Sequence, residues 1–179
     1  SLGLVGSEMC IRDSHLSAHE KKEKIRQRLW KIRAKKVVIA TGAIERPLIF
    51  SNNDRPGIIL SSSIKKYIDY YGVKVGENIS LFTNNDSAYE TAISLNKSGI
   101  KIKVIIDIRE NSSSILSEQI EKAGIKILRG YTVTDTDGYK RIKSIDVMKL
   151  SKDGGNVVGN KITYKCDCLG ISGGWTPMV

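Results

Sequence analysis

Two short segments of this chain end an apolar run in a turn of very small residues. They are residues 36–43 (KVVIATGA) and residues 168–175 (CLGISGGW). The turn residues that could do chemistry are Thr41, Gly42, Ser172, Gly173 and Gly174. Glycine has no side chain and accepts positive φ angles, so such a turn lets a bare backbone approach a bound cofactor. These five residues are therefore candidate cofactor-binding positions.

A third candidate position lies between the two turns, in residues 78–89 (NISLFTNNDSAY). The pattern predicts a strand, a loop and a helix, the arrangement in which a dinucleotide-binding unit carries its G-x-G-x-x-G fingerprint. Here the sequence TNNDSA replaces the glycines, so Asn84 and Asn85 are candidate ligands, and Asp107 is the candidate partner of a ribose hydroxyl. The alternative is a helix capped by its own residues that holds no ligand, because the acid in this loop would repel a pyrophosphate.

The composition is that of an ordinary globular protein with a basic excess. The 179 residues carry a formal net charge of +10 and a pI of about 9.5. The lysines are scattered over the expected solvated faces, so we expect no nucleic-acid partner. No apolar run approaches the ~18 residues of a membrane span. Cys166 and Cys168 form a C-x-C pair, but no His-rich segment completes a metal site, which predicts no metal and favours free cysteines in a reducing, cytoplasmic compartment.

The candidate turns must be positioned by the strands and helices that hydrophobic periodicity predicts. The apolar run at 36–40 favours a strand buried on both faces, as in a parallel sheet. After a loop at 45–57 we expect helix 61–71, strand 79–83, helix 86–98, strand 101–106, helix 116–123 and strand 125–128. Such a β-α-β-α-β order indicates a parallel sheet with right-handed crossovers. A β-meander at 131–134, 139–150 and 157–164 and a last buried strand at 167–171 complete the prediction.

These elements predict a Rossmann-like, three-layer α/β fold with a central βαβαβ parallel sheet and a β-meander insert. Residues 26–60 are expected to belong to a first nucleotide-binding domain. Residues 61–165 would form an inserted second domain, and residues 166–179 would return to the first. Residues 1–25 are expected to lack structure, because residues 1–14 resemble a translated sequencing-adapter read.

Four motifs, in order along the chain, carry a resemblance to a known family. They are residues 28–50 (RLWKIRAKKVVIATGAIERPLIF), 53–57 (NDRPG), 82–89 (FTNNDSAY) and 171–177 (ISGGWTP). Over residues 26–179 the chain resembles the alpha-subunit family of heterotetrameric sarcosine oxidases, which are FAD/NAD(P)-dependent oxidoreductases with two dinucleotide-binding domains.

The resemblance implies an oxidoreductase subunit that acts on the CH–NH group of its donor. In that family the alpha subunit holds NAD, the beta subunit holds FAD, and FMN lies at their interface. The complex, completed by gamma and delta subunits, demethylates the secondary amine sarcosine and passes a one-carbon unit to folate. By this resemblance the chain is a middle fragment of the alpha subunit and inactive alone. It carries no catalytic residue, since amine oxidation belongs to the beta subunit.

Two other functions remain open at this point. A subunit of a related flavin- or NAD-dependent amino-acid or opine dehydrogenase would have the same two-domain organisation. A non-catalytic assembly scaffold would account for the missing glycines of the central loop. The segments 45–47 (ERP) and 54–56 (DRP) are expected to order their loop through charge-assisted hydrogen bonds, either beside a cofactor or only within the loop itself.

Overall fold

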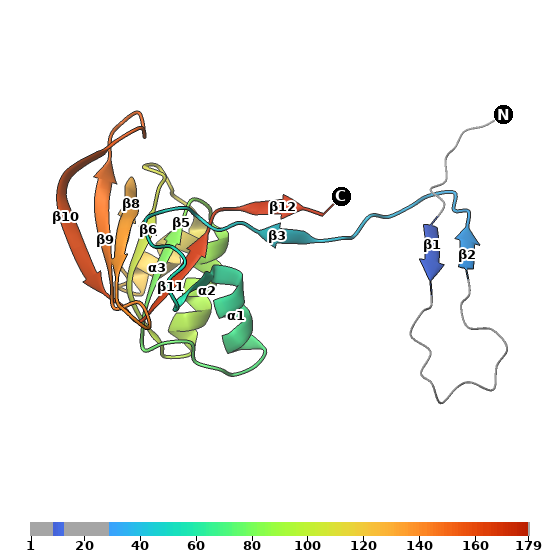
Figure 1. Cartoon of the computed structure of the whole chain (residues 1–179), viewed down its shortest axis with the longest axis horizontal. Helices are drawn as coiled ribbons and strands as arrows, with labels where there is room; N and C mark the ends of the chain where they lie inside the picture. Colours follow the sequence, from blue (N-terminus) through green and yellow to red (C-terminus); the bar gives the residue numbers. More distant parts are fainter. Residues whose placement is uncertain (1–8, 13–28, 179) are drawn as a thin grey trace. The chain divides into compact units, whose positions relative to one another are not determined.

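The computed structural model describes residues 9–12 and 29–178 of the chain. Contacts divide the chain into two units, Ser1–Gly42 together with Val179, and Ala43–Met178. Each unit is described by itself. The second unit holds all the described helices and most of the described strands (Figure 1).

The first unit contains a two-stranded antiparallel ribbon. β1 (Met9–Arg12) pairs with β2 (Leu29–Ile32). We predicted no structure before residue 26, and that prediction is wrong for the four residues of β1. Their pairing satisfies backbone groups of β2 that would otherwise have to bond to water. The rest of residues 1–25 lies outside the described residues.

The buried strand predicted at 36–40 does not form. The segment has no regular structure, and Val37, Val38 and Ile39 are 44%, 88% and 65% exposed. A strand buried on both faces needs neighbouring strands to pair with and further layers to cover it. In the described part of the first unit the only strands are β1 and β2, and they pair with each other.

The second unit is built on a five-stranded sheet. Its strands stand in the order β4 (Ile58–Leu60), β11 (Cys168–Ser172), β5 (Asn78–Thr83), β6 (Lys101–Asp107) and β7 (Ile127–Arg129). Every neighbouring pair is parallel. The connecting helices are α1 (Ser61–Asp69), α2 (Ser87–Lys97) and α3 (Ile115–Lys122). The predicted β-α-β-α-β alternation is confirmed.

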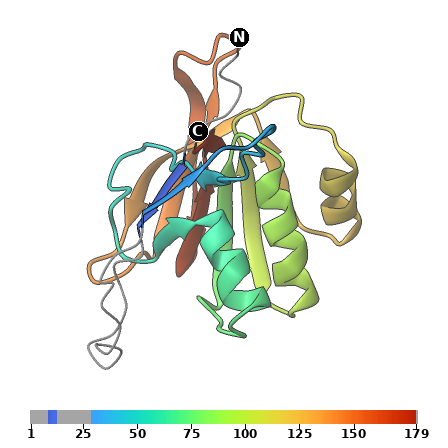
Figure 2. The same ribbon diagram turned by 90° about the vertical axis from the view of Figure 1, so that its right-hand side faces the viewer.

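The helices cover one face of this sheet and a β-meander covers the other, which makes three layers (Figure 2). The meander consists of β8 (Tyr131–Asp137), β9 (Ser144–Leu150) and β10 (Val157–Lys165), which are antiparallel to one another. The three-layer α/β class and the meander insert were both predicted from the sequence.

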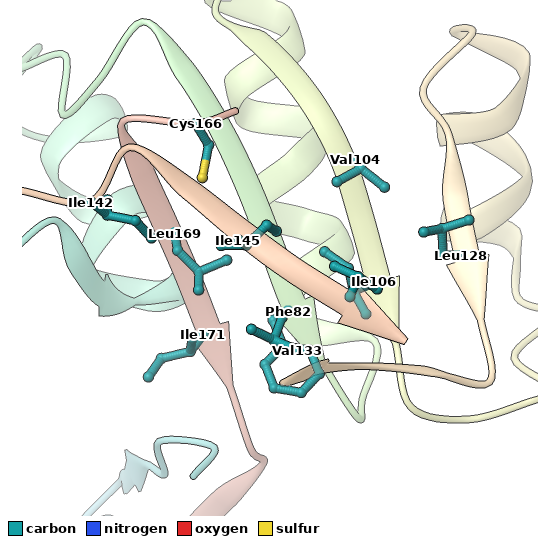
Figure 3. Packing of buried hydrophobic residues seen from close by; sticks show 11 residues of the cluster. Phe82, Val104, Ile106, Leu128, Val133, Ile142, Ile145, Cys166, Leu169 and Ile171 are labelled. Atoms are coloured by element: carbon teal, nitrogen blue, oxygen red, sulfur yellow. The ribbon is translucent and has the colours of Figure 1, made fainter. Parts of the chain in front are cut away.

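Each face of the sheet has its own hydrophobic core, because successive residues of a strand point to opposite faces. On the helix side, Leu81 of β5 packs in one cluster with Ile64 of α1. On the meander side, Phe82 of β5 packs with Val133 of β8 and Ile145 of β9 (Figure 3). The carboxyl edge of the sheet is therefore held rigidly from both sides.

Two strands of this sheet differ from the sequence-based expectation. We expected residues 166–179 to return to a first domain, but β11 pairs with both β4 and β5 and so belongs to the sheet of the second unit. The short strand β4 was not predicted. Its three residues run directly into α1 and are too few to show a periodicity of their own.

The meander also differs at two strand boundaries, since β8 continues to Asp137, beyond its expected end at residue 134. The strand expected from residue 139 begins at Ser144. Gly138 takes a φ of 135°, and the Ile142 N–H donates to the carbonyl oxygen of Pro56 at 2.9 Å. Residues 138–143 therefore form a loop that crosses to the segment before β4.

A second antiparallel ribbon joins the segments that follow the two small-residue turns. β3 (Ala43–Glu45) pairs with β12 (Trp175–Pro177), with Glu45 opposite Trp175 and Ala43 opposite Pro177. We call β3 and β12 together the crossing ribbon. The two ends of the second unit therefore leave it side by side.

Candidate functional site

The carboxyl ends of three neighbouring strands place several predicted site residues side by side. Ser172 of β11 is the register partner of Thr83 in β5, and Thr83 is the partner of Asp107 in β6. Asn84 and Asn85 follow Thr83 directly. Open α/β sheets bind their ligands at this edge, so the structure brings four of the candidates to the place where a ligand is expected.

Asn85 occupies the head of α2 with its own side chain. Its Nδ2 donates to the carbonyl oxygen of Ser172 at 3.2 Å and to the Ser172 hydroxyl at 3.1 Å. Its Oδ1 accepts from the Ser87 N–H at 3.0 Å. The Asn85 N–H donates to the Thr83 hydroxyl at 3.0 Å. Asp86 is the N-cap residue of α2 and makes no capping hydrogen bond with its side chain.

The loop between β5 and α2, residues 84–86, also reaches the segment that follows β11. The Asn84 N–H donates to the carbonyl oxygen of Ser172 at 3.3 Å, and its Nδ2 lies 3.5 Å from the carbonyl oxygen of Gly173. From the other side, Trp175 Nε1 donates to the Ser87 hydroxyl at 3.1 Å. The head of α2 is therefore bonded to three of the four residues between the end of β11 and the start of β12.

Asp107 is completely buried at the end of β6 and both of its oxygens accept hydrogen bonds. Oδ1 accepts from the N–H and Nε of Arg109 at 2.9 and 3.1 Å. Oδ2 accepts from Arg109 Nη2 at 2.7 Å and from the Tyr89 hydroxyl at 2.6 Å. Arg109 Nη2 also donates to Asp86 at 2.6 Å, so one guanidinium joins two carboxylates.

Burial and these bonds set the protonation states. Burial works to raise the pKa of Asp107, but the hydrogen bonds from Arg109 and Tyr89 outweigh it and hold that pKa below its ordinary value. Burial, followed by the bond to Asp107, raises the pKa of Tyr89 to about 12. The bond to Asp107 raises the pKa of Arg109. At neutral pH the group is therefore an ionised carboxylate held by a cation and a neutral phenol.

The glycines of the two turns have different surroundings. A Cβ on Gly173 would lie 2.9 Å from the carbonyl oxygens of Arg46 and Pro47, and the Gly173 N–H donates to the first of these at 2.7 Å. Close approach of two backbones requires glycine there. Gly174 (φ 93°) and Gly42 (φ 74°) would have nothing within 4 Å of an added Cβ, so only their positive φ calls for glycine.

Thr41 and Gly42 lie in the first unit, whereas the sheet edge lies in the second. The predicted site residues are therefore divided. Ser172, Gly173 and Gly174 share the second unit with the two asparagines and Asp107.

The two acid–arginine–proline segments tie their loop to neighbouring elements. Glu45 is 4% exposed, and its Oε2 accepts from the Ser62 N–H at 2.8 Å, which caps α1. Arg55 donates to the hydroxyl and the carbonyl oxygen of Thr136, both at 3.3 Å, and so ties the loop to β8. These contacts join the loop to α1 and to β8.

Metal and membrane features are absent from the part of the chain that the structure describes. There, no group of three or more His, Cys, Asp or Glu side chains gathers as a metal site requires, and no helix is long and apolar enough to cross a membrane. Cys166 and Cys168 pack in the two different cores. Residues two apart on one strand would share a face, but Cys166 lies between β10 and β11, and only Cys168 belongs to a strand. Burial raises the pKa of Cys166 to about 11 and that of Cys168 to about 12.

Sequence reasoning missed Tyr89, Arg109 and Trp175 as members of this edge. Tyr89 was assigned only to a helix, and its spacing in α2 gives no sign that its hydroxyl meets Asp107. Arg109 carried a usable signal, because an arginine two residues after a buried strand-end acid is placed to pair with it.

Curated relatives that share one name align with most of this chain. Sarcosine oxidase subunit alpha of Corynebacterium sp. (strain P-1) is 38% identical over 156 residues, 86% of the chain. Its counterparts from Corynebacterium sp. (strain U-96) and Rhizobium meliloti (strain 1021) are 36% and 34% identical over 94% and 86% of the chain. The chain is homologous to part of the sarcosine oxidase alpha subunit. It spans 16%, 17% and 14% of the length of these three relatives. No family model matches.

The chain is also similar to solved structures of oxidoreductases. Thioredoxin reductase of T. acidophilum has a TM-score of 0.62 at 21% identity and covers 83% of this chain and 47% of its own. An FAD-dependent pyridine nucleotide-disulphide oxidoreductase of Desulfovibrio vulgaris has a TM-score of 0.57 at 14% identity, over 84% and 38%. At these identities the likeness shows the fold, and it confirms the predicted Rossmann-like class.

Proposed function

We propose that this chain is part of the alpha subunit of a sarcosine oxidase-like oxidoreductase that acts on the CH–NH group of its donor. The observation that carries the proposal is the 34–38% identity to sarcosine oxidase alpha subunits over at least 86% of the chain. The structural neighbours have other names and lower identities, so the sequence relatives alone support the choice of substrate.

The proposed contribution of this chain is to position a cofactor. Thr41 and Gly42 of the first unit, and Ser172, Gly173 and Gly174 of the second, are the proposed cofactor-binding residues. The open space beside Gly42 and Gly174 supports this, because a bare backbone there can meet a ligand directly. NAD would be the dinucleotide of this subunit. FAD, FMN, the beta, gamma and delta subunits, and folate would belong to the complete complex in the cytoplasm.

The decisive experiment is purification of the complete protein that contains this chain, together with its partner subunits. We expect bound flavin and nicotinamide, and hydrogen peroxide formed in proportion to added sarcosine. Sarcosine oxidation that needs an added electron acceptor and forms no peroxide would identify a dehydrogenase instead. A complex that is repeatedly free of cofactor would leave only the scaffold function.

A matched pair of variants tests the cofactor turn. Gly174→Ala and Gly154→Ala both place a Cβ at positive φ (93° and 70°) with nothing within 4 Å, so both carry the same kind of backbone strain, about 1 kcal/mol. Gly154 lies in the turn between β9 and β10, away from the crossing ribbon. We expect only Gly174→Ala to lower the nicotinamide content of the complex. An equal loss in both variants would argue against a cofactor at this turn.

A further inference from the structure

The head of α2 is the place where a βαβ unit normally holds a dinucleotide. The pyrophosphate lies against free backbone N–H groups there, and the helix dipole favours its charge. In this chain the Asn85 N–H already donates to Thr83 and the Ser87 N–H to the side chain of Asn85. The Tyr89 N–H donates to the carbonyl oxygen of Asp86 at 3.0 Å. Three donors of the phosphate position therefore have partners inside the protein.

The charges around this loop also oppose an anionic ligand. Asp86 is the N-cap residue of α2, and its side chain is 42% exposed. A pyrophosphate against α2 would therefore meet a carboxylate. The nearby cation, Arg109, is shared between Asp86 and Asp107, so two negative charges already offset its charge.

The ribose position is closed as well. An acid that binds a ribose hydroxyl must present a carboxylate oxygen to the ligand. Asp107 is 0% exposed, and its two oxygens accept four hydrogen bonds from Arg109 and Tyr89. To reach a ribose, Asp107 would have to leave these partners in a buried place, which is unfavourable for a charged group.

The polar groups of the loop have a different partner, the segment that leads from β11 into the crossing ribbon. Asn85 donates to both the carbonyl oxygen and the hydroxyl of Ser172. Ser87 accepts from Trp175, which is the first residue of β12. Asn85 and Ser172 are 87 positions apart in the sequence, and Ser87 and Trp175 are 88 positions apart.

We propose that the β5–α2 loop does not bind a dinucleotide and that Asn85 and Ser87 instead fasten the crossing ribbon to the sheet. They are positioning residues for the segment 172–175. The inference does not depend on which substrate the complete protein oxidises. It assigns any dinucleotide of this chain to a place other than the edge formed by β5 and β6.

Nucleotide titration of the 179-residue chain tests the first half. The isotope-labelled chain is titrated with millimolar NAD⁺, NADP⁺ and ADP-ribose while backbone amide shifts are recorded. We expect no saturable shift at the amides of residues 84–89 and 107–109. Saturable shifts in both segments with any of the three compounds would overturn the proposal.

Amide hydrogen exchange in loop variants tests the second half. The Arg46 N–H, bonded to Gly174, and the Gly173 N–H, bonded to Arg46, report on the anchored end of the ribbon. In Asn85→Ala we expect both to exchange about tenfold faster, since the loss of part-buried hydrogen bonds of ordinary strength opens the contact locally. The Ile105 N–H, which lies in β6 and donates to Lys126, should keep its rate.

Two further variants keep the test decisive. Asn96→Ala removes an exposed asparagine on the same helix and should leave the Arg46 and Gly173 rates unchanged. Trp175→Phe keeps an aromatic side chain but removes the indole N–H that donates to Ser87. It should speed exchange at the same two amides, and it serves as the test if Asn85→Ala unfolds the whole unit. Wild-type rates at these amides in both Asn85→Ala and Trp175→Phe would show that the loop does not fasten the ribbon.

Discussion

The ion pair at the end of β6 gives the sharpest stability prediction. Arg109→Met keeps an unbranched apolar stem but removes Nε and Nη2, which lie 3.1 and 2.7 Å from Asp107. The carboxylate, at 0% exposure, keeps only the Arg109 backbone N–H and the Tyr89 hydroxyl. It becomes a buried charge that has lost the cation hydrogen-bonded to it.

The expected loss follows from two magnitudes. Removing one partner of a buried ion pair costs about 3–5 kcal/mol, and a hydrogen bond to a charged group contributes about 1.5–3 kcal/mol. The guanidinium is 35% exposed and two donors remain, so the lower values apply. We expect Arg109→Met to lower the free energy of unfolding by about 2–3 kcal/mol.

Urea unfolding at neutral pH, followed by circular dichroism, measures this loss. The control is Lys65→Met, which removes a surface pair with Asp69 in which both side chains are about 40% exposed; it should cost less than about 0.5 kcal/mol. Adding Asp107→Asn to Arg109→Met should restore part of the loss, because a neutral amide tolerates the site better. Equal losses for Arg109→Met and Lys65→Met would refute the reasoning.

The pH dependence of the loss has a defined sign. The pKa of Asp107 in the folded protein lies below its ordinary value. Its stabilisation is therefore present above the unfolded pKa and is lost as the pH falls through the folded pKa. In Arg109→Met burial is no longer outweighed, so the pKa of Asp107 rises. The loss in free energy of unfolding caused by Arg109→Met should be largest at neutral pH. It should shrink in acid, where the Asp107 carboxyl of the variant takes up a proton.

Three further outcomes are expected. Phe82→Ala, in the meander-side core at 1% exposure, should lower the free energy of unfolding by about 3–5 kcal/mol in urea titration. Gly173→Ala places a Cβ 2.9 Å from two backbone oxygens and should cost about 1–3 kcal/mol, whereas Gly155→Ala meets only a flexible carboxylate at 3.5 Å and should be nearly neutral. Cys166 and Cys168 should resist a thiol reagent at pH 8 until urea unfolds the chain, because burial raises both thiol pKa values.

The sequence predicted the fold well where elements are long and alternate regularly. β5, α2, β6 and α3 were predicted within about two residues, since each shows a period of its own. β4 and the place of β11 could not be predicted in the same way. A three-residue strand has no periodicity, and five consecutive buried residues in β11 show burial on both faces but not which strands are its neighbours.

The candidate site was predicted in composition but not in its contacts. The small residues and asparagines were identified from their types, and the structure gathers Asn84, Asn85, Asp107 and Ser172 at one sheet edge. What they bond to depends on pairs such as Asn85 and Ser172, 87 residues apart. The strand expected at 36–40 failed for a related reason, because its burial depends on neighbours that its own sequence does not contain.

The crossing ribbon is held at one pair of opposed residues by two helices. Glu45 of β3 and Trp175 of β12 are register partners. Glu45 accepts from the Ser62 N–H in the first turn of α1, and Trp175 donates to the Ser87 hydroxyl in the first turn of α2. Each strand of the ribbon is thus tied to the head of a different helix, and both helices pack on the same face of the sheet. The direction in which the ribbon leaves the sheet is therefore set by two helix N-termini. One of them, the N-terminus of α2, is also the place that a dinucleotide would need.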